Sequence, residues 1–175
     1  FTEPESALRR AGRVPDQHVL SEREGFVLHP DRIPADADLV IIGNPTNPTG
    51  VLHPRSTLDA LRAPGRVLVI DEAFMDAIVG EADSLISADL DGVLVVRSLT
   101  KTWGLAGLRA GYVVGDPSLL RLLAEQQPHW SVSSLAARAS VAVCAPAARA
   151  EEAELAREAA TWRHHLVRGL QSLGL

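Results

Sequence analysis

Four short apolar runs, each closed by a polar residue or a glycine, constrain the fold of this chain more than any other feature. They cover residues 39–42, 67–70, 93–96 and 111–114. Runs that are rich in β-branched residues and lack polar alternation are typical of strands covered on both faces. Helical segments are indicated at 54–61 and 117–127, where Pro117 suits a first helical position. We therefore predict an α/β fold, a three-layer sandwich around a mainly parallel sheet.

The last part of the chain has a different pattern. Residues 146–173 contain no proline after Pro146, and apolar side chains recur on one helical face. These are Leu155, Ala159, Trp162, Leu166, Leu170 and Leu173.

We expect two parts, a partial large domain over 1–145 and a long helix over 146–175 that leads toward a small domain mostly absent here. Residues 1–35 show no pattern that assigns a structure, and because the first residue is Phe1, we expect the chain to begin inside a longer protein.

Composition excludes several classes of protein. The net charge of −5 argues against a chain built to hold nucleic acid or an anionic membrane surface. Cys144 is the only cysteine, so neither an internal disulfide nor a multi-cysteine zinc site can form. No apolar run is long enough to span a bilayer, and no signal-peptide pattern opens the chain. We expect a cytoplasmic protein without a membrane partner.

Polar residues follow three of the predicted strands, at 44–50, 71–72 and 98–101. Ligands of open α/β sheets bind beyond the carboxyl ends of the strands, so these residues are candidates for one site. A lysine that we expect to be buried, an aspartate, an asparagine and a nearby arginine are a poor set for redox or metal chemistry. They suit an anionic cofactor with a carbonyl group, because lysine amines form Schiff bases with carbonyls.

Two nucleotide-binding alternatives fit the sequence less well. Residues 69–73 resemble the magnesium-binding strand of helicase-like ATPases, which also need a glycine-rich phosphate loop. The Lys101-Thr102 pair has no glycine in the six residues before it, so that alternative requires a loop outside this chain. Gly104, Gly107 and Gly111 do not form a dinucleotide-binding pattern.

The six histidines show no metal-ligand spacing, and we expect no metal site.

Three motifs resemble those of the class I/II aminotransferases, which use pyridoxal 5′-phosphate (PLP). Residues 43–50 are similar to the Asn-Pro-x-Asn-Pro-Thr-Gly signature, and residues 71–74 to the Asp-x-Ala-Tyr segment. Residues 98–101, followed by Gly104, Gly107, Arg109 and Gly111, resemble the block around the cofactor-binding lysine. The motifs occur in family order, and the resemblance is clearest over 36–139. It implies that the chain is a piece of the large PLP-binding domain of a fold-type I enzyme.

The resemblance also implies residue roles. Lys101 would bind the cofactor covalently and move protons at the substrate α-carbon. Asp71 would keep a proton on the pyridine nitrogen, and Asn47 would donate to the ring oxygen. Ser98 and Arg109 would hold the phosphate, where the arginine fork matches two oxygens.

Each of these residues also has an ordinary structural interpretation. Lysines are mostly solvated, an aspartate at this place can close a turn, and a strand-end serine can bond the backbone. Glu72 is expected to be a solvated or salt-bridged carboxylate without a catalytic role.

Phe74 departs from the family, because tyrosine often stands there and phenylalanine cannot donate a hydrogen bond to the cofactor. The same phenylalanine occurs in the L-threonine-O-3-phosphate decarboxylases of cobalamin biosynthesis. Residues 71–76, 96–101, 126–128 and 130–132 resemble that subgroup. We therefore expect threonine-phosphate decarboxylation. The alternatives are amino-group transfer, as in the related histidinol-phosphate aminotransferases, and a non-catalytic scaffold or binding domain.

The resemblance carries further expectations. The substrate would be a small amino acid or amino phosphate, and the full-length enzyme would be a homodimer with sites at its interface. The chain does not show the family's upstream glycine-rich phosphate-binding helix start, its ring-stacking aromatic residue or its downstream carboxylate-binding arginine. We therefore expect the isolated chain to bind PLP weakly, to turn nothing over and to leave the apolar stripe of its long helix partly exposed.

Overall fold

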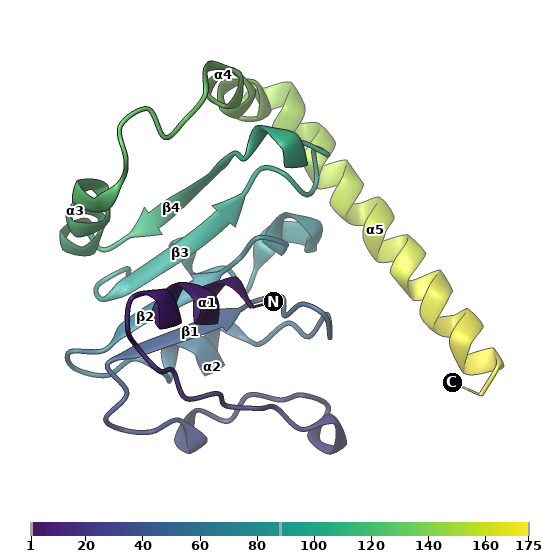
Figure 1. Cartoon of the computed structure of the whole chain (residues 1–175). Coiled ribbons are helices and arrows are strands. Elements are labelled where there is room, and N and C mark those ends of the chain that lie inside the picture. The colour runs from purple at the N-terminus through teal and green to yellow at the C-terminus, as the bar shows by residue number, and fades with distance from the viewer. Residues whose placement is uncertain (1, 88, 175) are drawn as a thin grey trace.

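The computed structural model describes residues 2–87 and 89–174, and its centre is a four-stranded sheet (Figure 1). The strands are β1 (Leu39–Gly43), β2 (Val67–Asp71), β3 (Val93–Ser98) and β4 (Gly111–Gly115). They lie in the order β1-β2-β3-β4; β1, β2 and β3 are parallel, and β4 is antiparallel to β3. The predicted mainly parallel α/β sheet is confirmed, and each strand begins at its predicted residue.

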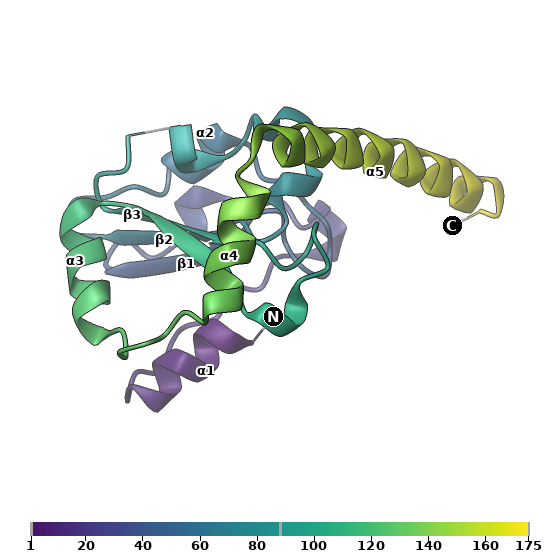
Figure 2. The same ribbon diagram turned by 90° about the horizontal axis from the view of Figure 1, so that it is seen from above.

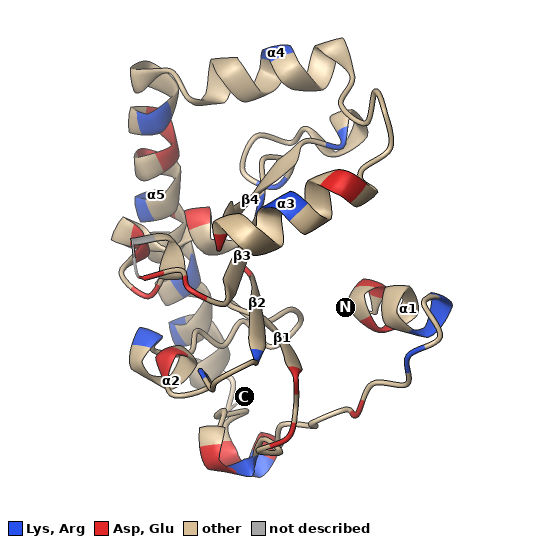
Figure 3. Ribbon diagram, turned by 90° about the vertical axis from the view of Figure 1, so that its left-hand side faces the viewer, with Lys and Arg blue, Asp and Glu red and all other residues tan. Residues whose placement is uncertain are grey.

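Helices flank the sheet. The α-helices are α1 (Glu3–Arg10), α2 (Arg55–Asp59), α3 (Pro117–Gln126), α4 (Ser134–Val143) and α5 (Pro146–Ser172). Short 3-10 segments are η1 (Glu22–Glu24), η2 (Pro30–Arg32), η3 (Met75–Ala77), η4 (Val79–Glu81), η5 (Leu85–Ser87) and η6 (Ala106–Leu108). Figures 2 and 3 place α2 and α5 on one side of the sheet and α1 on the other, which agrees with the predicted layers. Helices α1 and α4 were not predicted.

The core lies against the central strands, β2 and β3. Its fully buried members include Leu68 and Ile70 of β2, Val95 of β3, and Leu58 of α2. The strand β4 does not fit the prediction of burial on both faces, because Tyr112 is 44% and Val113 38% exposed. It is the last strand in the sheet order, so its outer edge has no neighbouring strand among the described residues.

Helix α5 is buried only near its beginning. Glu152 and Ala156 are buried where the helix packs on η3 and η4. Farther along, Trp162 is 70% and Leu166 60% exposed, and the helix extends away from the sheet (Figure 1). The predicted long helix and its partly exposed apolar stripe are both confirmed. None of the described helices is long and apolar enough to cross a membrane.

Candidate active site

The sheet topology gathers the predicted site residues at one edge. The parallel strands β1, β2 and β3 end there, and the antiparallel β4 begins there. Gly43 pairs with Asp71, and Ser98 pairs with Gly111. The segments that follow β1, β2 and β3, together with the turn that precedes β4, therefore meet at the carboxyl edge, as the positions of the polar residues predict.

Asp71 ends β2 and is half-buried. Its Oδ1 accepts a hydrogen bond from the Ala73 N–H at 3.0 Å, so the aspartate does close the turn after the strand. Burial raises the pKa of Asp71, whereas the Ala73 hydrogen bond and the charge of Lys101 act in the opposite direction. The carboxylate and the lysine are thus close enough to interact electrostatically.

Lys101 lies in the loop after β3, and its side chain is exposed, so the expectation of a buried lysine was wrong. It lies three residues beyond the end of the strand. Its Nζ lies 5.3 Å from the centroid of the Phe74 ring, within the range of a cation–π contact. Lys101 is also the only lysine in the 175-residue sequence, a signal that the motif comparison missed.

The segments that carry Ser98 and Arg109 lie side by side because β3 pairs with β4. Ser98 Oγ lies 2.7 Å from Thr100 Oγ1 and accepts from the Thr100 N–H at 3.2 Å, so it is partly satisfied by the backbone. The Leu99 N–H donates to Ala110 O at 3.1 Å, which holds the Arg109 segment beside this turn. Arg109 is exposed, and its Nη1 donates to Ala106 O at 3.2 Å. Within the described chain it has no ion-pair partner.

Asn47 follows β1 at the same edge, in an exposed turn. The buried Asn44 shapes this loop: its Oδ1 accepts from the His53 N–H at 2.7 Å, and its Nδ2 donates to His53 O at 3.1 Å. Thr46 N–H also donates to Val51 O at 2.9 Å. Among the described residues Asn47 makes no hydrogen bond with Asp71 or Lys101, so its cofactor role stays a prediction.

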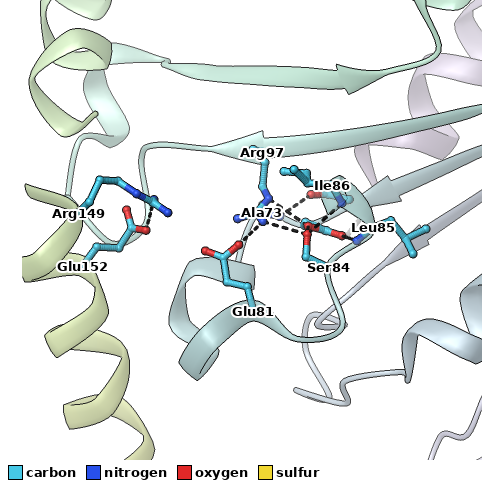
Figure 4. Close-up of polar contacts among 10 residues, drawn as sticks. Ala73, Glu81, Ser84, Leu85, Ile86, Arg97, Arg149 and Glu152 are labelled. Carbon is cyan, nitrogen blue, oxygen red and sulfur yellow. Dashed lines mark hydrogen bonds and ion pairs between the residues drawn. The ribbon is translucent and has the colours of Figure 1, made fainter. Parts of the chain in front are cut away.

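Glu72 is salt-bridged, one of the two states predicted for it, and it is buried at 1% exposure. Arg97 Nε lies 3.0 Å from Glu72 Oε2, an ion pair that lacks hydrogen-bond geometry. Ser84 Oγ donates to Glu72 Oε2 at 2.7 Å, and the Leu85 N–H donates to Oε1 at 2.8 Å. Arg97 also pairs with Glu81 and reaches toward Ser84 (Figure 4).

This ion pair lies behind the site. Successive side chains of a strand point to opposite faces. Glu72 and Arg97 are therefore on the face opposite to Asp71 and Ser98, their neighbours in sequence. The pair joins the end of β2 to the end of β3, and so fixes the relative position of the two segments that carry the candidate site residues.

Comparison with known proteins identifies the family. The sequence model described as "Aminotransferase class I and II" matches residues 26–175. A histidinol-phosphate aminotransferase of Mycobacterium bovis is 51% identical over 99% of this chain and 47% of the relative. The threonine-phosphate decarboxylase of Salmonella typhimurium is 35% identical over 79% of this chain and 41% of the relative.

A solved structure agrees with these relatives. A double mutant of Thermus thermophilus aspartate aminotransferase superposes with a TM-score of 0.84 and 29% identity, over 99% of this chain and 49% of that one. The chain thus spans about half the length of the relatives that it matches. It belongs to the class I and II aminotransferases, a family of PLP-dependent enzymes.

The residues at the sheet edge fit this cofactor. The Lys101 amine is exposed and has no anionic partner within 4 Å among the described residues, so it can meet a carbonyl. Asp71 Oδ2 makes no hydrogen bond within the described chain and can face a protonated ring nitrogen. The hydroxyls of Ser98 and Thr100 and the Arg109 guanidinium are suitable donors for a phosphate. Among the described residues, no group of three or more His, Cys, Asp or Glu side chains could hold a metal ion.

Proposed function

We propose that the protein binds PLP through Lys101 and uses it to transform a small amino acid or amino phosphate. One observation carries this proposal: the chain's only lysine lies at the carboxyl edge of the sheet, over Phe74 and within electrostatic reach of Asp71. Bound PLP supplies an electron-withdrawing ring that stabilises negative charge at the substrate α-carbon.

Each site residue has a part in this proposal. Asp71 holds the proton on the ring nitrogen, and its half-buried position strengthens that interaction. Ser98 and Arg109 bind the phosphate, and Asn47 donates to the ring oxygen. The Lys101 amine would take the proton from the substrate α-carbon and could return one.

Amino-group transfer is the reaction that the relatives favour. The relatives with the higher identity, 51% over 99% of this chain, are called histidinol-phosphate aminotransferases. We therefore propose an amino phosphate such as histidinol phosphate as the donor and a 2-oxo acid as the acceptor. The protein is further proposed to work as a homodimer in the cytoplasm, as the family resemblance implies.

Decarboxylation of threonine phosphate is the second candidate. The sequence motifs around Phe74 and Trp130 favour it, and relatives with this name are 35% identical over 79% of the chain. The two reactions differ in one bond. Transfer breaks the bond from the α-carbon to hydrogen, whereas decarboxylation breaks the bond from the α-carbon to the carboxylate.

The two reactions and the non-catalytic alternative are separated by one set of assays. The PLP-loaded full-length protein is supplied with histidinol phosphate plus a 2-oxo acid, or with threonine phosphate alone. Loss of the amino group in the first mixture supports transfer, and release of carbon dioxide in the second supports decarboxylation. Lys101→Ala should abolish both activities and the protein-bound PLP absorbance. A full-length wild-type protein without that absorbance would leave only the scaffold alternative.

A further inference from the structure

The side chain of Lys101 makes few interactions that could fix its position. Its side chain has no hydrogen bond and no ion pair within the described chain, and a lysine stem has four rotatable bonds. Apart from the electrostatic interaction with Asp71, the contact with the Phe74 ring is the only side-chain interaction described for it. The position of the amine therefore depends on how its backbone is held on either side.

On the N-terminal side, the turn after β3 holds the backbone. The hydroxyls of Ser98 and Thr100 lie 2.7 Å apart, and the Leu105 N–H donates to Thr100 O at 3.1 Å. On the C-terminal side, the Gly104 N–H donates to Lys101 O at 3.2 Å within the loop, and a further contact comes from another segment. Thr102 Oγ1 donates a hydrogen bond to Asp76 Oδ2. Asp76 belongs to η3, which follows β2 and the Asp71 turn.

The segments after β2 and β3 therefore run side by side and make two neighbouring contacts. Phe74 lies under Lys101, and Asp76 accepts from the next residue, Thr102. The η3 segment is itself firmly placed, because Met75 is fully buried and α5 packs on η3 from behind. A loop anchored in this way can position the residues of its neighbour.

Thr102 Oγ1 is the side-chain donor to Asp76 in the described part of the chain, although Arg97 also interacts electrostatically with the carboxylate. Its second oxygen, Oδ1, is buried and makes no hydrogen bond within the described part of the chain. Buried polar atoms without a partner cost stability and are uncommon in folded proteins. Residues that break this rule are expected mainly at functional sites.

We propose that Asp76 is a positioning residue for Lys101, acting through the hydroxyl of Thr102. The carboxylate holds the backbone immediately after Lys101 and thereby keeps the amine over the Phe74 ring, at the edge where Asp71 ends β2. This inference rests on the proposed function, because the position of the amine matters only if Lys101 binds PLP. The position of the amine over the Phe74 ring can nevertheless be measured without PLP.

The single lysine makes that measurement direct. Reductive methylation with ¹³C-formaldehyde labels Lys101 and the N-terminal amine, and the Lys101→Arg variant identifies the N-terminal signal. Methyl groups held over an aromatic ring resonate upfield, so the Lys101 methyl signal should be shifted upfield in the wild-type chain. Phe74→Leu should remove that shift and so confirm its source.

Four variants then test the contact. Asp76→Ala and Thr102→Val delete one partner each, whereas Asp76→Asn and Thr102→Ser keep an acceptor and a donor. We expect both deletions to lose the upfield shift and both conservative variants to keep it. Thr161→Val, at an exposed position on α5, is the matched control and should behave as wild type. Circular dichroism verifies that each variant is folded.

A second readout connects the geometry with the cofactor. PLP is added, the adduct is reduced with borohydride, and the modified peptide is quantified by mass spectrometry. The deletion variants should be trapped about three- to tenfold more slowly than wild type, the effect of one net hydrogen bond. If the deletions keep both the shift and the trapping rate, Asp76 does not position Lys101. If the deletions lose the shift as expected but wild-type Lys101 is never trapped by PLP, the positioning stands and the proposed function fails.

Discussion

At the scale of single residues, the charge of Asp71 can be separated from its structural role. Its Oδ1 accepts the Ala73 N–H, and an asparagine at this position keeps that acceptor. Asp71→Asn should therefore retain the fold but lose the negative charge that holds the ring proton. We expect kcat of the PLP-loaded full-length protein to fall roughly 10²- to 10³-fold, as for other charge-stabilising groups.

The control for this prediction is Asp59→Asn. Asp59 lies on α2 and pairs with Arg62 at 3.0 Å on the surface, so its loss should leave turnover unchanged. Circular dichroism verifies the fold, and a steady-state assay measures kcat, for the wild type, Asp71→Asn and Asp59→Asn. Turnover of Asp71→Asn within about twofold of wild type would remove Asp71 from the mechanism, because RT ln 2 is far below the interaction expected of a partly buried charge.

At the scale of the strands, the Glu72–Arg97 pair should be important for stability. Arg97→Met leaves Glu72 buried at 1% exposure without its cation, and removing one member of a buried pair costs about 3–5 kcal/mol. We expect a lower free energy of unfolding of that size in urea denaturation. The double variant Glu72→Gln with Arg97→Met should recover part of it, because the unpaired charge is gone. A double variant less stable than Arg97→Met alone would contradict this explanation.

Glycines at the β3–β4 junction allow a second comparison. A Cβ at Gly111 would lie 2.7 Å from Arg97 O, so alanine there must push the two strands apart. At Gly107 a Cβ would meet nothing within 4 Å, and the backbone has no positive φ. We expect Gly111→Ala to lower the free energy of unfolding by about 1–3 kcal/mol and Gly107→Ala to be nearly neutral. Equal losses of unfolding free energy in the two variants would show that the close approach of Gly111 to Arg97 O does not exclude a side chain.

The sequence predicted the features that depend on neighbouring residues and missed those that depend on residues far apart in the chain. Apolar runs and Pro117 depend on neighbouring residues, so the strands and α3 were predicted to within a residue or two. The exposure of β4 depends on its place at the edge of the sheet, and no local pattern reports that. The contacts of Lys101 with Phe74, and of Thr102 with Asp76, join loops 26 or more residues apart, so motif spacing could only place these residues at one edge.

At the scale of the whole molecule, α5 presents an apolar surface with no described covering element. Trp162, Leu166 and Leu170 are 70%, 60% and 39% exposed and are spaced four residues apart, so they lie on one side of the helix. The helix projects from the body (Figure 1), which leaves this side open to another molecule. Exposed apolar patches of this kind favour association.

This surface predicts concentration-dependent self-association of the chain. Burying a leucine side chain contributes about 1.5–3 kcal/mol, so Leu166→Glu should weaken the association constant at least about tenfold. The matched control is Arg163→Gln, which changes a polar residue one turn earlier on the same helix and should have little effect. Sedimentation velocity over a range of protein concentrations measures both variants. A wild-type chain that stays monomeric at every concentration, or equal weakening by the two substitutions, would show that the apolar stripe does not drive association.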